Sequence, residues 1–206
     1  MSISTNLYKM KILKPLIGIW FFSCLVLNAQ AQDEPTALSV GDKAFNFTGT
    51  DQNGNAVELF EILEESPVVL MFYRGAWCGY CNKQLSEMED SLKFINEKGG
   101  VVIAVTPEQP ESIEKTIKKT NASFKILHDK DLKIMKTYNV DYALENSIVK
   151  KYKSYGINLL ESNKENGANL PVPATYIIGK DKKILYAFFD PDYTKRATVG
   201  KILQNL

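Results

Sequence analysis

Two cysteines, Cys78 and Cys81, stand where an apolar run changes into a helical pattern. The run covers residues 67–73, and its unbroken apolar character predicts a buried central strand. Residues 82–88 then follow a helical pattern, so the pair lies on a strand-to-helix turn. There the first sulfur meets unpaired N–H groups and the positive end of the helix dipole, which favour a thiolate. The second sulfur lies one turn later and can attack a mixed disulfide on the first. This context predicts a redox dithiol rather than half of a zinc site.

The N-terminal residues have the features of a targeting segment. An apolar run over residues 16–27 is short for a membrane span, and residues 29–31 read Ala-Gln-Ala, a cleavage signal. The positive residues before the run are Lys9, Lys11 and Lys14. We therefore expect a signal peptide over residues 1–31, export, most simply to the periplasm, and one domain over residues 32–206. The alternatives are an uncleaved signal anchor and a lipoprotein modified at Cys24.

Cleavage after residue 31 would change the cysteine count and the charge. Only Cys78 and Cys81 would remain, so an exported chain would lack a disulfide framework that stabilises the fold. The pair is therefore better explained by a chemical role than by a structural one. The formal net charge would fall from +1 to about −2, because three lysines and no acidic residue are removed. That balance gives no electrostatic case for nucleic acid or for an anionic membrane as a partner.

Apolar runs and helical spacing predict an α/β domain, with residues 142–167 left unassigned. Strands are expected over 44–48, 67–73, 101–105, 123–127, 175–178 and 184–189. Helices are expected within 57–63 and over 78–98, 110–120, 132–138 and 197–206. This succession predicts a central mixed β-sheet with a parallel centre and an antiparallel far edge, flanked by helices on both faces.

Three blocks of sequence resemble a known family. They are residues 72–82, residues 170–176 and residues 190–196, with residues 40–44 as a further match near the start. Together they resemble the thioredoxin-like fold in its peroxiredoxin-like branch, the alkyl hydroperoxide reductase/thiol-specific antioxidant (AhpC/TSA) family. The resemblance implies a thiol redox protein that needs no bound cofactor. No metal is expected, because one histidine and the two cysteines would leave a zinc site without a convincing fourth ligand.

In a thioredoxin-type mechanism Cys78 is the attacking thiolate and Cys81 resolves the mixed disulfide. Arg74 is a candidate to stabilise the thiolate, because a nearby cation favours the charged sulfur. The alternative role for the pair is a structural disulfide that does not turn over. Such a short loop would add little chain-entropy stabilisation.

The resemblance also implies a substrate groove beside the pair. Pro173 is expected to follow a cis peptide bond, which would expose the backbone of Val172 to an extended substrate segment. The alternative is an ordinary trans proline at the start of an edge strand. Trp77 and Tyr80 flank the sulfurs and are expected to contribute packing and an apolar platform for a substrate peptide.

The peroxiredoxin motif, P-x-x-x-T-x-x-C, assigns the roles differently. Its proline falls on Arg74, its threonine on Cys78 and its peroxidatic cysteine on Cys81. The arginine that polarises peroxide is replaced by Pro173, although Arg74 or Arg196 could substitute for it. These departures favour disulfide exchange over efficient peroxidase chemistry.

Weaker signals complete the set of candidates. Thioredoxin carries a buried aspartate six residues before its first cysteine, and Phe72 stands there in this chain. Glu87 and Asp90 are weak replacements, better explained as a solvated helix face, and His128 reads as part of a strand-end loop. The block near the C-terminus is expected to form a structural corner through Asp192, Tyr193 and Arg196.

The sequence therefore predicts an exported thiol–disulfide oxidoreductase that exchanges disulfides with a partner protein or a small thiol. The second hypothesis is a thiol-dependent peroxidase in which Cys81 attacks the peroxide. The third is a binding module that keeps the fold and a static disulfide. The direction of electron flow and the oligomeric state stay open.

Overall fold

The computed structural model describes residues 35–206. The predicted signal segment and Cys24 lie outside the described residues, so the cleavage prediction stays a prediction.

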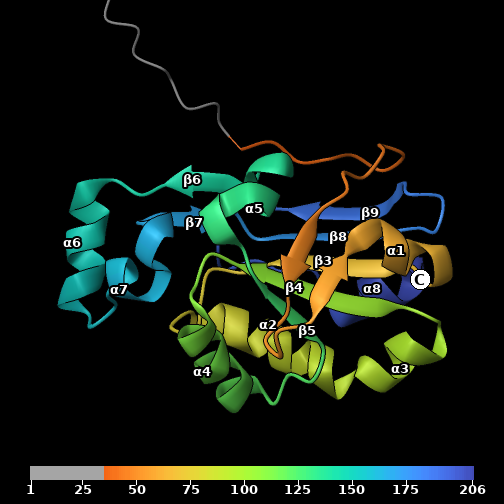
Figure 1. Ribbon diagram of the computed structural model, residues 1–206, viewed down its shortest axis with the longest axis horizontal. Coiled ribbons are helices and arrows are strands. Elements are labelled where there is room, and N and C mark those ends of the chain that lie inside the picture. Colours follow the sequence, from red (N-terminus) through yellow and green to blue (C-terminus); the bar gives the residue numbers. More distant parts are fainter. Residues whose placement is uncertain (1–34) are drawn as a thin grey trace, which may run out of the picture. The chain divides into compact units, whose positions relative to one another are not determined.

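A five-stranded sheet forms the centre of the described domain, in the order β5-β4-β3-β8-β9 (Figure 1). Strands β3, β4 and β5 run parallel, whereas β8 runs antiparallel to β3, and β9 antiparallel to β8. The strand bounds are β3 Val68–Phe72, β4 Val101–Thr106, β5 Lys125–His128, β8 Ala174–Ile178 and β9 Ile184–Phe189. The predicted parallel centre and antiparallel far edge are confirmed.

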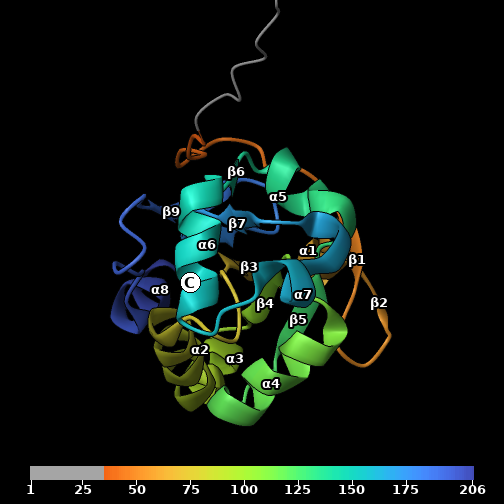
Figure 2. The same ribbon diagram turned by 90° about the vertical axis from the view of Figure 1, so that its left-hand side faces the viewer.

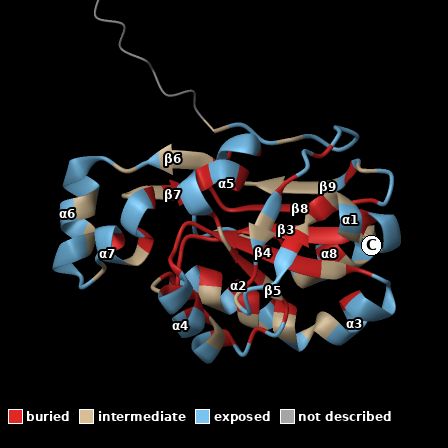
Figure 3. Cartoon of the chain, viewed as in Figure 1, coloured by how far each residue is buried: buried red, intermediate tan, exposed pale blue. Residues whose placement is uncertain are grey.

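Strand β3 is buried along its whole length because helices cover both faces of the sheet (Figure 3). Alternate residues of β3 point to opposite faces. Val68, Leu70 and Phe72 enter one apolar cluster, and Val69 and Met71 enter the other. A strand that is apolar on both faces is what a doubly covered sheet requires.

Different helices supply the two apolar layers. Helices α1 (Leu59–Glu65) and α5 (Lys133–Thr137) contribute to the first cluster. Helices α2, α3, α4 and α8 contribute to the second (Figures 1 and 2). Their bounds are Gly79–Asp90, Leu92–Glu97, Pro110–Thr120 and Val199–Asn205.

The segment that the sequence left unassigned forms an arm at one end of the domain (Figure 1). It contains β6 (Asp141–Ala143), α6 (Asn146–Ser154), α7 (Leu159–Asn163) and the 3₁₀ turn η2 (Lys164–Asn166). Strand β6 pairs antiparallel with β7 (Asn169–Pro171). A second pair, β1 (Thr48–Thr50) with β2 (Ala56–Glu58), and the turn η1 (Lys130–Leu132) complete the described elements.

Two predicted elements differ from the structure. The helix expected over 78–98 is two helices, because Ser91 leaves helical geometry at φ −105° and ψ 3° and separates α2 from α3. The strand expected over 44–48 begins only at Thr48, and Lys43 makes an isolated bridge to Lys183.

Among residues 35–206, no helix is both long and apolar enough to span a membrane.

Packing of α2 on the sheet holds the cysteine pair in place, so truncating its buried side should destabilise the fold. Met88 is 0 % exposed. We expect Met88→Ala to lower the free energy of unfolding by about 2–5 kcal/mol, measured by urea denaturation. The matched control is Glu87→Ala on the exposed side, where only a solvent-exposed pair with Lys83 is lost and a change below about 1 kcal/mol is expected. Equal losses for the two variants would contradict this account of α2.

Candidate active site

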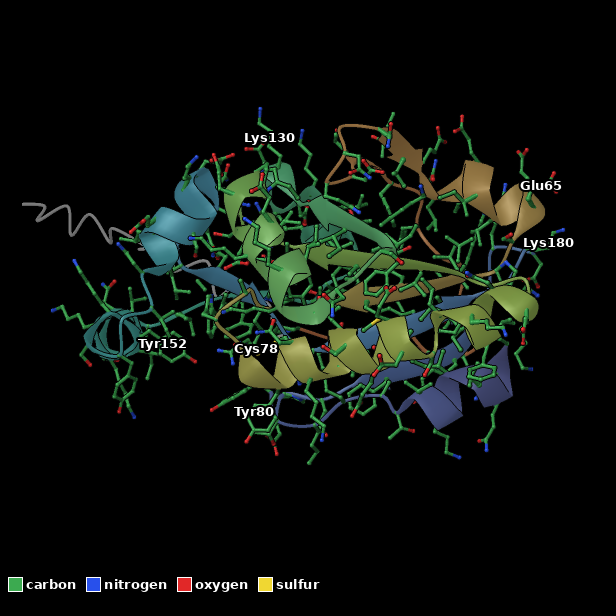
Figure 4. All side chains as sticks on the ribbon, turned by 90° about the horizontal axis from the view of Figure 1, so that it is seen from below. Glu65, Cys78, Tyr80, Lys130, Tyr152 and Lys180 are labelled. Carbon is green, nitrogen blue, oxygen red and sulfur yellow. A yellow bond between two sulfur atoms is a disulfide. The ribbon has the colours of Figure 1, made fainter. Side chains whose placement is uncertain are left out.

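Cys78 caps the N-terminus of α2, and the two cysteines form a disulfide. The Cys81 backbone N–H donates a hydrogen bond to Cys78 Sγ at 3.3 Å. This bond satisfies one of the unpaired N–H groups of the first helical turn and places the sulfur at the positive end of the helix dipole. Figure 4 shows Cys78 and Tyr80 at this end of α2. The predicted strand-to-helix placement of the pair is confirmed.

Both cysteines are buried, and Cys78 is slightly less buried than Cys81. Cys78 is 4 % exposed and Cys81 is 0 % exposed. Gly79 is exposed, and the Tyr80 side chain is 50 % exposed. An incoming group therefore reaches Cys78 before Cys81.

Arg196 contacts both sulfurs. Its Nη2 lies 3.2 Å from Cys81 Sγ and 3.8 Å from Cys78 Sγ. The corner that precedes α8 holds it there, because Arg196 also donates to the carbonyls of Tyr193 and Lys195. Burial and the neighbouring Arg74 lower the pKa of Arg196 to about 10, so it stays charged at neutral pH. The sequence analysis proposed Arg196 as part of a structural corner and as a substitute for the peroxiredoxin arginine. It could not show that Arg196 lies beside the two sulfurs.

Arg74 lies in an aromatic cluster rather than on the sulfurs. Its side chain is 1 % exposed, and its Nη2 donates to the Tyr152 hydroxyl at 2.6 Å. The guanidinium carbon is 4.4 Å from the centre of the Tyr193 ring and 5.0 Å from that of Trp77. The Tyr193 ring in turn meets Tyr80 edge-on at 6.1 Å. A cation over aromatic faces is stabilised by their quadrupoles. The predicted effect of Arg74 on the thiolate stays a prediction.

A buried carboxyl group holds the loop that leads into Cys78. Glu108 follows β4, and its Oε2 accepts a hydrogen bond from the Ala76 N–H at 2.7 Å. The Ala76 carbonyl accepts from Lys119 Nζ at 2.7 Å and from Asn82 Nδ2 at 3.0 Å. Burial raises the pKa of Glu108 to about 7, against the lowering effect of the Ala76 N–H and the lysines of α4.

Glycine is required at position 75 by the same carboxyl group. Gly75 has φ +151°, and a Cβ there would lie 2.5 Å from Glu108 Oε1 and 2.7 Å from Trp77 Nε1. A side chain at this position would displace either the carboxyl group or the indole.

A pocket of about 410 Å³ opens beside this loop. Ala76, Trp77 and Glu108 line one part of it, and Lys115 and Lys119 of α4 line another. The arm closes the opposite part through residues 156–158, 161–162 and 164. The pocket therefore reaches the residue before Cys78.

Glu108 was missed by the sequence analysis, which considered Glu87 and Asp90. The structure leaves both of these on the solvent side of α2, outside its buried face. His128, the last residue of β5, has its Nδ1 2.8 Å from the Glu108 carbonyl oxygen. Glu108 could have been found from its position, because residues that follow neighbouring parallel strands meet at one edge of a sheet.

The prediction of a cis peptide bond before Pro173 is wrong. All peptide bonds of the described residues are trans. The chain runs from β7 into β8 with the Val172 N–H already donating to the Val140 carbonyl at 2.7 Å. Val172 and Pro173 are both buried, and the Pro173 carbonyl accepts from the Asp190 N–H at 3.3 Å. This segment is thus paired within the chain, and its role in a substrate groove stays a prediction.

The pKa of Glu108 should make stability depend on pH. A carboxyl group with a folded-state pKa of about 7, against an ordinary 4.5, binds its proton more tightly in the folded state. Stability should therefore fall as the pH rises from 4.5 to 7, by up to about 3 kcal/mol, and then level off. Glu108→Gln should remove most of this fall in urea unfolding at a series of pH values. Glu114→Gln, on the exposed side of α4, is the control that should keep it. If the dependence of stability on pH is unchanged in Glu108→Gln, its attribution to Glu108 is contradicted.

Named relatives fall in two groups of thiol proteins. The thiol-disulfide oxidoreductase ResA of a Bacillus cereus strain is 27% identical over 149 residues, covering 72% of this chain and 68% of the relative. The chloroplastic peroxiredoxin Q of Oryza sativa subsp. japonica is 29% identical over 172 residues, covering 82% and 68%. These likenesses support a thiol-based redox function.

Solved structures agree on the fold. The crystal structure of peroxidoxin BcpB from Mycobacterium tuberculosis superposes with a TM-score of 0.62 at 21% identity, covering 82% of this chain and 96% of that one. The thioredoxin-like fold predicted from the sequence is confirmed.

The AhpC/TSA family pattern matches residues 40–187, which include β3, β4, β5 and β8, the start of β9, the cysteine pair and Glu108. The chain therefore belongs to the AhpC/TSA family.

Proposed function

We propose that this protein is a thiol–disulfide oxidoreductase in which Cys78 reacts with the partner and Cys81 resolves the mixed disulfide. One observation carries the assignment: Cys78 caps α2 and is the less buried of the two cysteines, whereas Cys81 is fully buried. A helix N-terminus stabilises the thiolate that attacks or leaves.

The chemistry follows from these positions. When the pair is reduced, the Cys78 thiolate attacks a partner disulfide, and one partner sulfur leaves as a thiolate. Cys81 then attacks Cys78 Sγ, releasing the second partner sulfur and closing the Cys78–Cys81 disulfide. The Arg196 guanidinium, 3.2 Å from Cys81 Sγ, favours the thiolate form that this second attack requires.

Exposed aromatic side chains would receive the partner. Tyr80 is 50 % exposed and Tyr193 is 43 % exposed, and their rings contact each other beside Cys78. Aromatic rings supply large contact areas at low entropic cost. The partner would be a protein segment or a small thiol that lays apolar surface on these rings. Trp77 and the backbone of Val172 and Pro173 are its predicted further contacts.

The place of action would be outside the cytoplasm, and in a cell with two membranes the periplasm. This part of the proposal depends on the predicted signal segment, residues 1–31. Cell fractionation of the expressed full chain tests it. Retention in the cytoplasm at full length would contradict it.

Single cysteine variants separate the roles of the two sulfurs. Cys81→Ser should accumulate mixed disulfides with partners, because the resolving sulfur is gone, and mass spectrometry should locate them on Cys78. Cys78→Ser should abolish reduction of insulin disulfides. The opposite pattern, with partners captured through Cys81 in Cys78→Ser, would reverse the assignment.

A thiol-dependent peroxidase is the second candidate. The observation that favours it is the contact between Arg196 and Cys81, the position of the peroxidatic cysteine in the family motif. In this reaction the Cys81 thiolate attacks peroxide and becomes a sulfenate as water or hydroxide leaves. Cys78 then displaces the sulfenate oxygen to form the disulfide. The full burial of Cys81 argues for exchange as the first candidate.

Peroxide labelling distinguishes the two candidates. In reduced Cys78→Ser under limiting hydrogen peroxide, the peroxidase mechanism gives a Cys81 sulfenic acid that a dimedone probe captures. Stopped-flow fluorescence of Trp77 during oxidation of the wild-type protein gives the rate. We expect a rate no greater than that of a free thiolate, together with rapid exchange against glutathione disulfide. A much faster oxidation, with labelled Cys81, would make the peroxidase the first candidate.

A further inference from the structure

Two arginines beside the cysteine pair lack carboxylate partners. Among residues 35–206, no carboxylate oxygen lies within 4.0 Å of Arg74 or Arg196. Arg74 is 1 % exposed, and Arg196 is partly buried. In that part of the chain, the buried Nε atoms of both side chains also have no hydrogen-bond partner. Buried cations without a counter-charge are unfavourable, so this arrangement needs an explanation.

The anions available nearby do not neutralise the two guanidinium groups. Asp192 acts on Arg196 only at longer range, and its carboxylate is 3.9 Å from Lys195. The Glu108 carboxyl group is bound to the Ala76 N–H, on the same loop that Lys119 contacts. Arg74 contacts neutral groups instead: the Tyr152 hydroxyl and the rings of Trp77, Tyr152 and Tyr193.

The sulfurs themselves can supply the missing negative charge, but only when they are reduced. In the disulfide both sulfur atoms are neutral. Reduction creates a thiolate at Cys78, which accepts the Cys81 N–H and lies 3.8 Å from Arg196 Nη2. A thiolate at Cys81 would lie 3.2 Å from the same nitrogen. Arg196 therefore stabilises the reduced state relative to the oxidised state.

We propose that Arg196 makes the Cys78–Cys81 disulfide an oxidant, which transfers its disulfide to partner dithiols. This inference rests on the proposed exchange function and adds the direction of electron flow and the class of substrate, a peptide that carries two thiols. A disulfide whose reduced form is stabilised has a high reduction potential.

The transfer occurs in two balanced steps. A substrate thiolate attacks Cys78 Sγ, the bond to Cys81 breaks, and its electron pair leaves on Cys81 Sγ beside Arg196. The second substrate thiolate then attacks the substrate sulfur of the mixed disulfide, and Cys78 leaves as a thiolate at the α2 N-terminus. The substrate loses two electrons and the pair gains them. Of the two substrate protons, one passes to Cys81 and the other to solvent. An external disulfide of higher potential reoxidises the protein.

Stability measurements on the two redox forms test the direction. By linkage, an oxidant is more stable when reduced, because the potential of the folded pair exceeds that of the unfolded pair. We expect the reduced protein to unfold at a higher urea concentration than the oxidised protein at pH 7. A more stable oxidised form would overturn the proposal, even if exchange is fast. Absence of exchange with glutathione would instead contradict the proposed function.

Variants test whether Arg196 is the cause. Equilibration with glutathione buffers, followed by alkylation and mass spectrometry, gives the ratio of reduced to oxidised pair. Arg196→Gln should shift this equilibrium at least tenfold toward the disulfide, which is about 30 mV for two electrons. Lys195→Gln removes the same charge from an exposed neighbour and should shift it less than twofold. Equal shifts would overturn the assignment to Arg196. If Arg196→Gln fails to fold, the comparison of the two wild-type redox forms still decides.

Discussion

The position of β3 determines what this protein can do. The strand is paired on both sides, parallel to β4 and antiparallel to β8, and is buried on both faces. It therefore cannot shift in register without exposing apolar side chains. The loop before Cys78 leaves the sheet at the carboxyl end of β3. This loop leads directly into α2, whose N-cap is Cys78. The reactivity of the pair thus depends on the packing of the core.

Charge around the pair is distributed unevenly. The Arg196 guanidinium contacts Cys81 Sγ, and the Arg74 guanidinium lies over the Trp77 ring. The buried carboxyl group of Glu108 accepts from the Ala76 N–H, in the loop before Cys78. The three groups come from different elements: Arg74 from the end of β3, Glu108 from the end of β4, and Arg196 from the corner before α8. Since the elements converge at one edge of the sheet, distant parts of the sequence form one electrostatic site.

Local patterns predicted the elements and the cysteine pair, but not the long-range contacts. The apolar runs of β3, β4 and β8 were sufficient because burial on both faces leaves a clear signal, and the helical spacing of apolar residues was sufficient for α2. The break at Ser91 was missed because apolar spacing continues through it. The geometry of Pro173 was taken from the resemblance, and the Val172 pairing with Val140 differs from that expectation. Arg196 and Glu108 could be placed only once the sheet order was known.

The arm that contains α6 links the local stability of a surface helix to the surroundings of Arg74. Helix α6 has no buried residue, and it carries Tyr152 (Figure 4). The Tyr152 hydroxyl nevertheless accepts a hydrogen bond from Arg74. Elements with little buried surface open at low free energy, independently of global unfolding. Each opening of α6 would remove this neutral partner and admit water to the guanidinium. The hydration of a charge behind the active site is therefore set by the local stability of a surface helix, and amide exchange along α6 would report how often that happens.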